Sequence, residues 1–423
     1  MSSRVAPAPS PAPSTVPLHN TVRGRAVPVW ASLLALALGG FGIGTTEFAT
    51  MGVLPDIAGD LGASIPTAGH AITAYALGVV VGAPLFAVLG ARVPRKGMLL
   101  VLMAAIGLGN LLSALAPSFG LLVVARFVSG LPHGAFFGMA AVVAATLVPP
   151  SRRARAVATT MTGLTVANIV GVPLATLLGQ ALGWRSTYVT VVVIAALTLV
   201  AVELLVPRVS PGQDASPRRE LTALRRPLVW LTLLVAAVGF GGFFAVYSYI
   251  APTLTEVAGY PPAGIPVVLA LLGVGMTLGT VVGGRLADRS VLWTLVLSPV
   301  ATIVVLLAFT VTARGVVTAA VTAFLFGTVT SIALPALTAR LLDVAGDGKA
   351  LAATLNHSAL NVANALGAWL GGVVIAAGLG YTAPAVVGAG LAVVGLVILG
   401  ASVVVERRAG ARSDDEPGLR VAA

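Results

Sequence analysis

Acidic side chains are scarce in the apolar parts of this sequence, and that scarcity singles out Glu47. Of the 14 acidic residues, all but two fall in polar stretches or chain ends, and Glu203 lies close to the end of an apolar run. Only Glu47 lies well inside one. A carboxyl group in a hydrocarbon environment is costly unless it faces water or a partner. Reversible protonation is therefore the chemistry that Glu47 could perform.

Arg126 is the candidate partner of Glu47, because it also lies within an apolar run. If the first helix runs outward from Trp30, Glu47 lies roughly 25 Å along it, and Arg126 lies roughly 9 Å below the same surface in a helix that starts near Gly120. We expect both to line one central cavity, where a change in solvation and separation would load and unload a proton. In the alternative interpretation, Glu47 reaches the headgroups and Arg126 snorkels.

Further polar and aromatic side chains are candidates for a substrate cavity. His133 follows Arg126 by two helical turns, and could bind substrate, relay protons or simply bond a neighbouring helix. The amides could contact substrate or join helices, and the aromatic residues could form a cavity wall or contact lipid. The candidates are His133, Asn168, the helix face of His357, Asn361 and Asn364, and the aromatic row Phe240, Phe244 and Tyr247.

Gly171 and Pro173 lie within an apolar run, where they could bend a helix for close packing or act as a hinge.

Several kinds of chemistry find no support. The chain has no cysteine, which excludes disulfides and thiolate metal sites. The stretch Gly346-Asp-Gly-Lys349-Ala does not make a phosphate-binding loop, and no His-Glu-x-x-His motif occurs. We therefore predict neither a metal, nor a cofactor, nor an enzyme.

The elements that position these residues are membrane-spanning helices. The chain of 423 residues is 57% hydrophobic and only 9% charged, with a mean hydropathy of +1.01, far more apolar than soluble proteins. The net charge of +11 is spread between apolar runs, which argues against a nucleic-acid partner. Twelve spans are predicted, at about 30–52, 67–90, 97–116, 120–147, 156–180, 185–206, 228–250, 264–287, 291–312, 315–341, 350–377 and 382–404.

Lys and Arg predict the orientation of these spans. All but Arg185, Arg314 and the intramembrane Arg126 fall on the side that holds both chain ends. Under the positive-inside rule that side is cytoplasmic. The predicted divisions are a disordered tail at 1–28, a six-helix bundle at 29–206, a cytoplasmic linker at 207–227, a second bundle at 228–405 and a tail at 406–423.

The two bundles are copies of one unit. Residues recur at an offset of 197, which pairs Gly78 with Gly275, Gly82 with Gly279 and Gly130 with Gly327. Six helices repeated in parallel predict an all-α membrane protein with a cavity between its pseudo-symmetric bundles.

Four stretches resemble the major facilitator superfamily, and specifically its twelve-helix drug/proton antiporter division. The turn with Arg92, Arg95 and Lys96 resembles the loop after the second helix, Arg126-Phe-Val-Ser-Gly130 resembles the fourth-helix motif implicated in proton coupling, and Gly171-Val-Pro173 resembles the export motif. Thr46-Glu47-Phe-Ala-Thr resembles the branch of arabinose-efflux-permease-like and chloramphenicol-exporter-like proteins. In the loop motif Ala91 replaces the family's acid, which survives only as Asp288 beside Arg289 in the second half.

This resemblance implies alternating access, proton antiport, and gating by the two loops. We expect a monomer in the bacterial cytoplasmic membrane that exports a small amphiphile such as a chloramphenicol-like drug, with the lipid bilayer and protons as its other partners. Efflux of arabinose or a related glycoside and proton-linked uptake remain alternatives within transport. A polytopic membrane enzyme is disfavoured for want of a catalytic motif, and a channel because it needs no mobile two-bundle repeat.

Overall fold

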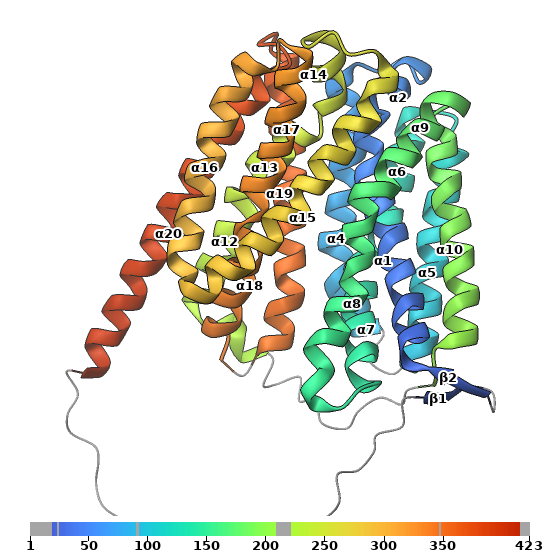
Figure 1. Ribbon diagram of the computed structural model, residues 1–423, viewed down its shortest axis with the longest axis vertical. Coiled ribbons are helices and arrows are strands. Elements are labelled where there is room, and N and C mark those ends of the chain that lie inside the picture. The colour runs from blue at the N-terminus through green and yellow to red at the C-terminus, as the bar shows by residue number, and fades with distance from the viewer. Residues whose placement is uncertain (1–18, 23–24, 90–92, 209–220, 347, 415–423) are drawn as a thin grey trace, which may run out of the picture.

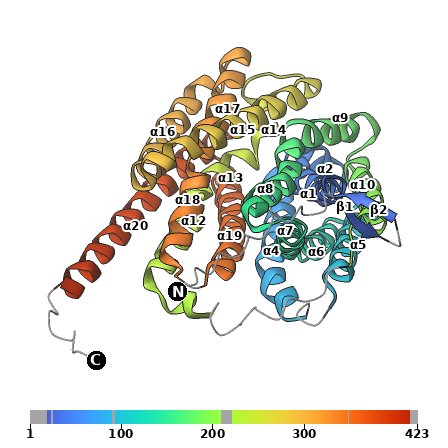
Figure 2. The same cartoon turned by 60° about the horizontal axis from the view of Figure 1, so that its bottom comes forward.

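The computed structural model describes residues 19–22, 25–89, 93–208, 221–346 and 348–414. Within them, twelve helical spans are long and apolar enough to cross a membrane, as the sequence predicted. Figure 1 shows them side by side, and Figure 2 shows that they form two groups. Several spans are broken into shorter helices, because proline removes a backbone donor and glycine weakens a helix.

The first group contains a hairpin and six spans. Its elements are β1 (His19–Val22), β2 (Arg25–Pro28), α1 (Val29–Gly52), α2 (Leu54–Asp60), α3 (Ile65–Ala68), α4 (His70–Leu89), α5 (Arg95–Ala114), α6 (Phe119–Gly130), α7 (His133–Thr146), η2 (Pro150–Arg152), α8 (Arg153–Val166), the π-helical turn η3 (Ala167–Gly171), α9 (Val172–Leu182) and α10 (Arg185–Leu205).

The second group contains the other six spans. Its elements are η4 (Leu221–Arg225), α12 (Pro227–Gly239), α13 (Gly241–Tyr247), α14 (Ile250–Glu256), η5 (Pro262–Gly264), α15 (Ile265–Arg289), α16 (Val291–Thr312), α17 (Val316–Ser331), α18 (Ala333–Val344), α19 (Lys349–Ala376) and α20 (Ala383–Asp414).

The described residues begin, at β1, and end, at the close of α20, at the same end of the molecule, which we call the basic end because it carries the Lys- and Arg-rich connections. The other is the distal end. At the basic end β1 and β2 pair antiparallel, and Val22 and Val27 are buried beside Leu205. This hairpin differs from the predicted disordered tail over 19–28, because alternate apolar residues find a surface on α10. The last helix runs to Asp414, beyond the predicted boundary at 405, whereas most of the predicted linker lies outside the described residues.

Recurrent glycines create the same helix contact in both bundles. A Cβ atom at Gly82 of α4 would lie 1.8 Å from the carbonyl oxygen of Leu131. The equivalent Gly279 of α15 would meet the carbonyl oxygen of Thr328 at 2.0 Å. Only glycine allows helix backbones to approach so closely. The repeat in the sequence is therefore a repeat in packing.

The bundles meet closely at the distal end and diverge towards the basic end. The distal half of α15 packs on η3 and α9, but α15 barely touches α8, and Figure 1 shows these helices separating downward. At the distal end Gln180 Nε2 donates to the carbonyl of Pro262, 2.9 Å away. The second seam, between α4 and α19, includes Tyr249, whose hydroxyl lies against Gly69 and donates to the carbonyl of Ala368.

Candidate substrate cavity

A cavity of about 120 Å³ lies between the bundles. Helices α1, α7, α8 and η3 contribute from the first bundle, and α12, α13, α15, α17, α18 and α19 from the second. Its lining comprises Glu47, Phe48, His133, Leu164, Asn168, Phe240, Phe243, Phe244, Met276, Ser331, Leu334, His357, Leu360 and Asn361. Six of the eight residues predicted for the substrate cavity line it, and the other two, Tyr247 and Asn364, do not.

Among the described residues, Glu47 is the only acidic side chain that lines this cavity. It is 6% exposed, so it faces the protein interior and not the headgroups. The Asn364 amide lies next to its carboxyl group, and Arg126 is close enough for its charge to act on it. The described residues contain no ion pair within 4 Å between Glu47 and Arg126. The carboxyl group is therefore influenced by a cation without being neutralised by direct contact.

Arg126 is fully buried and is held by α1. Its two terminal nitrogens donate to the hydroxyl and the carbonyl of Thr46, at 2.9 and 3.0 Å. Its guanidinium lies 4.3 Å from the ring centre of Tyr75 and 5.3 Å from that of Tyr188. Asn110 also bonds Thr46, and donates to Ser129 at 3.1 Å. These contacts compensate for much of the cost of burying the charge.

Arg126 was predicted to lie at about the same depth as Glu47, and the structure agrees, since Arg126 bonds Thr46, the residue before Glu47. The prediction that Arg126 lines the cavity is wrong. Its side chain turns behind α1, because the Thr46 oxygens and two aromatic faces solvate it better there. Its Nε atom remains without a hydrogen-bond partner.

His133 and His357 approach the cavity from opposite bundles. Nδ1 of His133 lies 2.9 Å from the hydroxyl of Tyr75. The His133 ring also lies 5.3 Å from that of Phe137, which stacks on His357 with ring centres 5.7 Å apart. Both histidines line the cavity, so this row of rings connects the bundles across it.

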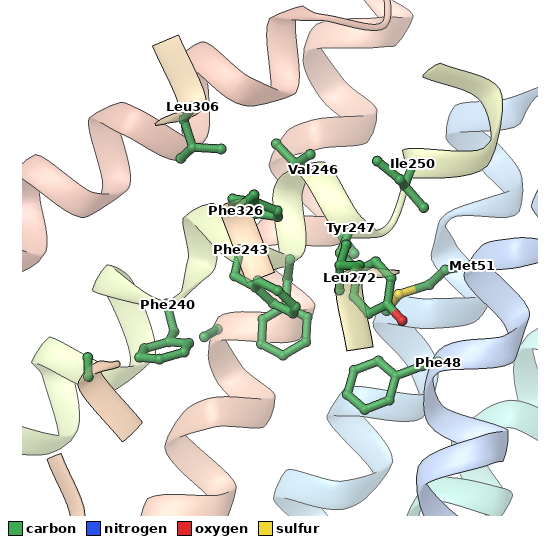
Figure 3. Close-up of a cluster of buried hydrophobic side chains, with 14 of the residues drawn as sticks. Phe48, Met51, Phe240, Phe243, Val246, Tyr247, Ile250, Leu272, Leu306 and Phe326 are labelled. Atoms are coloured by element: carbon green, nitrogen blue, oxygen red, sulfur yellow. The ribbon is translucent and has the colours of Figure 1, made fainter. Parts of the chain in front are cut away.

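The aromatic row on the broken seventh span is buried, so the lipid-contact alternative does not hold. Phe240 and Phe244 line the cavity and are 8% and 6% exposed. Tyr247 is not part of the lining, but its ring stacks on Phe48 of α1, with centres 5.4 Å apart. Figure 3 shows Phe48 facing this row from the other bundle. The row therefore closes the cavity towards the distal end.

Three buried amides surround Glu47 with unused bonding capacity. Asn168 and Asn361 line the cavity, and the Oδ1 atom of each lacks a hydrogen-bond partner. Asn364 is fully buried behind them, and neither of its amide atoms meets hydrogen-bond geometry. Buried amides normally find partners. Among the described residues, the unpartnered oxygens of Asn168 and Asn361 therefore lie at the cavity, while Asn364 lies beside Glu47.

The predicted bend in the fifth span has a distinct structure. Pro173 has no backbone N–H, so the carbonyl four residues before it loses its helical donor. The chain widens there into the π-helical turn Ala167–Gly171, a local form that is frequent at functional sites. A Cβ at Gly273 of α15 would lie 2.3 Å from the carbonyl oxygen of Asn168. The two bundles touch backbone to backbone at this turn.

The predicted gating residues are separated in the structure. Arg92 lies outside the described residues, and Arg95 begins α5. Lys96 is buried, and its Nζ lies 3.2 Å from a Glu203 carboxylate oxygen in the same bundle. Asp288 and Arg289 are exposed at the end of α15 and take part in none of the ion pairs found among the described residues.

Sequence reasoning missed the residues that support the site. Thr46 accepts hydrogen bonds from Arg126 and donates one to Asn110, and Phe48 and Phe137 supply the aromatic contacts between bundles. Phe137 lies one turn after His133, so helical spacing could have found it. Threonine and phenylalanine are too common in membrane helices for composition to single out Thr46 and Phe48.

Two six-helix bundles in a membrane, with a largely apolar cavity between them that holds one buried carboxyl group among the described residues, define a membrane transporter. Comparison then specifies the class: residues 36–354 match the family model "Major Facilitator Superfamily", and the chain belongs to that superfamily. It is 44% identical to "Inner membrane transport protein YdhP" of Escherichia coli (strain K12), over 87% of this chain and 94% of that protein.

A second relative supports the predicted branch. The chain is 35% identical to "Chloramphenicol resistance protein" of Streptomyces lividans, over 84% of this chain and 90% of that protein. Among solved structures, that of a D-xylose-proton symporter has the same fold, with a TM-score of 0.70 and 16% identity, covering 88% of this chain and 97% of that chain. This family and these relatives are transporters of the membrane, and the chain is a multi-pass protein of the inner membrane.

Proposed function

We propose that this transporter exports a small, ring-bearing amphiphile in exchange for protons, and that Glu47 carries the proton. The observation that carries the proposal is the position of Glu47, the one acid among the described residues of the cavity lining, together with an aromatic row and unpartnered amides. A charged carboxylate in so apolar a place is costly, and protonation removes that cost. Substrate and proton would thus compete for binding at the same part of the cavity.

The lining indicates the kind of molecule that fits. Phe240, Phe243 and Phe244 offer ring faces, which favour an aromatic or otherwise flat apolar group. Asn168 and Asn361 offer amide groups to a hydroxyl or amide of the substrate. Chloramphenicol combines a ring with such groups, and the name of the Streptomyces relative supports its use as the first test compound.

The cavity must widen before it can hold such a molecule. Its 120 Å³ is well below the roughly 300 Å³ or more of drug-sized binding sites. Widening is easiest towards the basic end, where α8 and α15 diverge. Under the predicted orientation that is the cytoplasmic side, from which an exporter loads.

The proposal is tested with purified protein in liposomes that enclose a pH-sensitive dye. Addition of chloramphenicol should change the internal pH with the wild-type protein, and Glu47→Gln should abolish this response. Glu256→Gln is the matched control, because it removes an exposed acid at the distal end. A Glu47→Gln variant that still couples proton flux to transport at the wild-type rate would exclude Glu47 as the proton carrier.

Efflux of a sugar remains the second candidate, because unpartnered amides also suit hydroxyl groups. The same liposomes should be given a pentose and a pentose glycoside in parallel. A pentose response that exceeds the chloramphenicol response would favour the sugar as substrate. The role of Glu47 would still stand if Glu47→Gln gives no change of internal pH with either compound.

A further inference from the structure

A second cavity, separate from the substrate cavity, lies at the basic end on the flank of the first bundle. It is a groove of about 630 Å³ between the first turns of α1 and the start of α8. Its lining comprises Val29, Trp30, Leu33, Leu34, Val148, Arg152, Arg155, Ala156 and Thr159. None of these residues lines the substrate cavity. The groove needs an explanation of its own.

The groove has one cationic part and one apolar part. Arg152 and Arg155 are exposed, and neither takes part in the ion pairs found among the described residues. Among the described residues that line the groove, none is acidic. Two guanidinium groups that share a groove without a carboxylate favour an anionic ligand, and their planar donors suit phosphate oxygens.

The apolar part continues along α1. Trp30 and Leu34 are 64% and 52% exposed, which is costly in water and favourable against lipid. Leu38 and Phe41 follow on the same helix face, at one and two turns beyond Leu34, and both are partly exposed. An apolar track thus leads from the arginines into the bilayer.

We propose that this groove binds an anionic phospholipid, with the phosphodiester group between Arg152 and Arg155 and an acyl chain along the Leu34 face of α1. Charge complementarity selects this occupant, because a neutral lipid would leave both arginines without a compensating charge. A soluble phosphate would leave Trp30 and Leu34 uncovered. Basic pockets at the ends of membrane helices are suited to acidic headgroups.

The site rests on the fold and not on the proposed transport chemistry. The lipid would bridge α1, which carries Glu47, and α8, which leads into η3. Binding can therefore be measured without any transport substrate, and its failure would leave the role of Glu47 untouched.

The experiment uses tryptophan quenching by brominated lipids, with the protein in nanodiscs. The quenching attributable to Trp30 is the difference between the wild-type protein and Trp30→Phe. In discs of mixed composition, brominated phosphatidylglycerol should quench Trp30 more strongly than brominated phosphatidylcholine. In the double variant Arg152→Gln/Arg155→Gln, the affinity for phosphatidylglycerol relative to phosphatidylcholine should fall roughly 30-fold, since each surface cation contributes appreciably to binding.

The double variant Arg407→Gln/Arg408→Gln is the control, because it removes two exposed cations from the basic end of α20, away from the groove. It should keep the preference. Equal quenching by the two lipids, or a preference that survives loss of Arg152 and Arg155, would overturn the proposal. Loss of the preference on addition of inorganic phosphate would also overturn it, because the groove would then bind a soluble anion. Gel filtration and circular dichroism of each variant verify folding.

Discussion

The two bundles share a backbone plan and differ in what they bring to the cavity. Positions 197 apart occupy equivalent places, yet Glu47 corresponds to Phe244 and Arg126 to Ala323. The first bundle contributes the Glu47 carboxyl group to the cavity and places the buried Arg126 guanidinium near it, bonded to Thr46 of the same bundle. The second contributes aromatic faces and amides, several of which remain unpartnered.

This difference shows how a duplicated membrane unit can divide its tasks. The close glycine contacts in each copy preserve the helix packing that a rocking motion needs. We infer that the first bundle governs the coupling of transport to protons, and that the second governs which molecule binds.

The largest effect should come from removing the cation of the first bundle. Arg126→Ala breaks both bonds to Thr46, and should reduce transport by more than about 100-fold and destabilise the protein by about 3 kcal/mol. Arg126→Lys keeps the charge and should recover part of both. Liposome transport and thermal unfolding in detergent measure the two effects. Wild-type transport by Arg126→Ala would show that coupling does not need this bundle's cation.

A smaller effect is expected in the second bundle. Phe244→Leu removes a ring face from the cavity and should weaken substrate binding about tenfold, while each transported molecule still moves the same number of protons. Phe309→Leu is the matched control, because Phe309 is buried outside the cavity lining. Substrate titration and the ratio of proton flux to substrate flux test this. A changed ratio in Phe244→Leu would break the division of tasks.

The smallest effect concerns the ion pair between Asp60 and Arg185 at the distal end, which has no counterpart in the second bundle among the ion pairs of the described residues. Asp60 accepts hydrogen bonds from Arg185 and Trp184, and these bonds lower the pKa of Asp60 below its usual value. A lowered folded-state pKa stabilises the fold above about pH 4, and the contribution is lost as the pH falls through the lowered pKa. The melting temperature of Asp60→Asn should therefore be slightly below wild type at neutral pH and equal to it in strong acid.

The equivalents of Asp60 and Arg185 in the second bundle are Val257 and Thr382, so no matching titration is expected there. A difference between Asp60→Asn and wild type that persists unchanged at low pH would show that Asp60 does not act through its charge.

The sequence was informative wherever polarity was rare. The spans and the burial of Glu47 at the cavity followed from the cost of charge in a bilayer, which is large compared with other residue preferences. The direction of the Arg126 side chain could not be predicted, because it depends on Thr46, Tyr75 and Tyr188 meeting around it. The β1–β2 hairpin was missed for a related reason, since Val22 and Val27 become buried only by packing against Leu205 of another helix.

The π-helical turn in the fifth span has a consequence for movement. At Asn168 and Gly273 the bundles meet with no side chain between their backbones, so this point can serve as a fulcrum while the two ends swing apart in turn. Atoms near a fulcrum travel least. The Asn168 amide would then stay beside its cargo throughout the cycle, whereas groups towards either end would make and break their contacts.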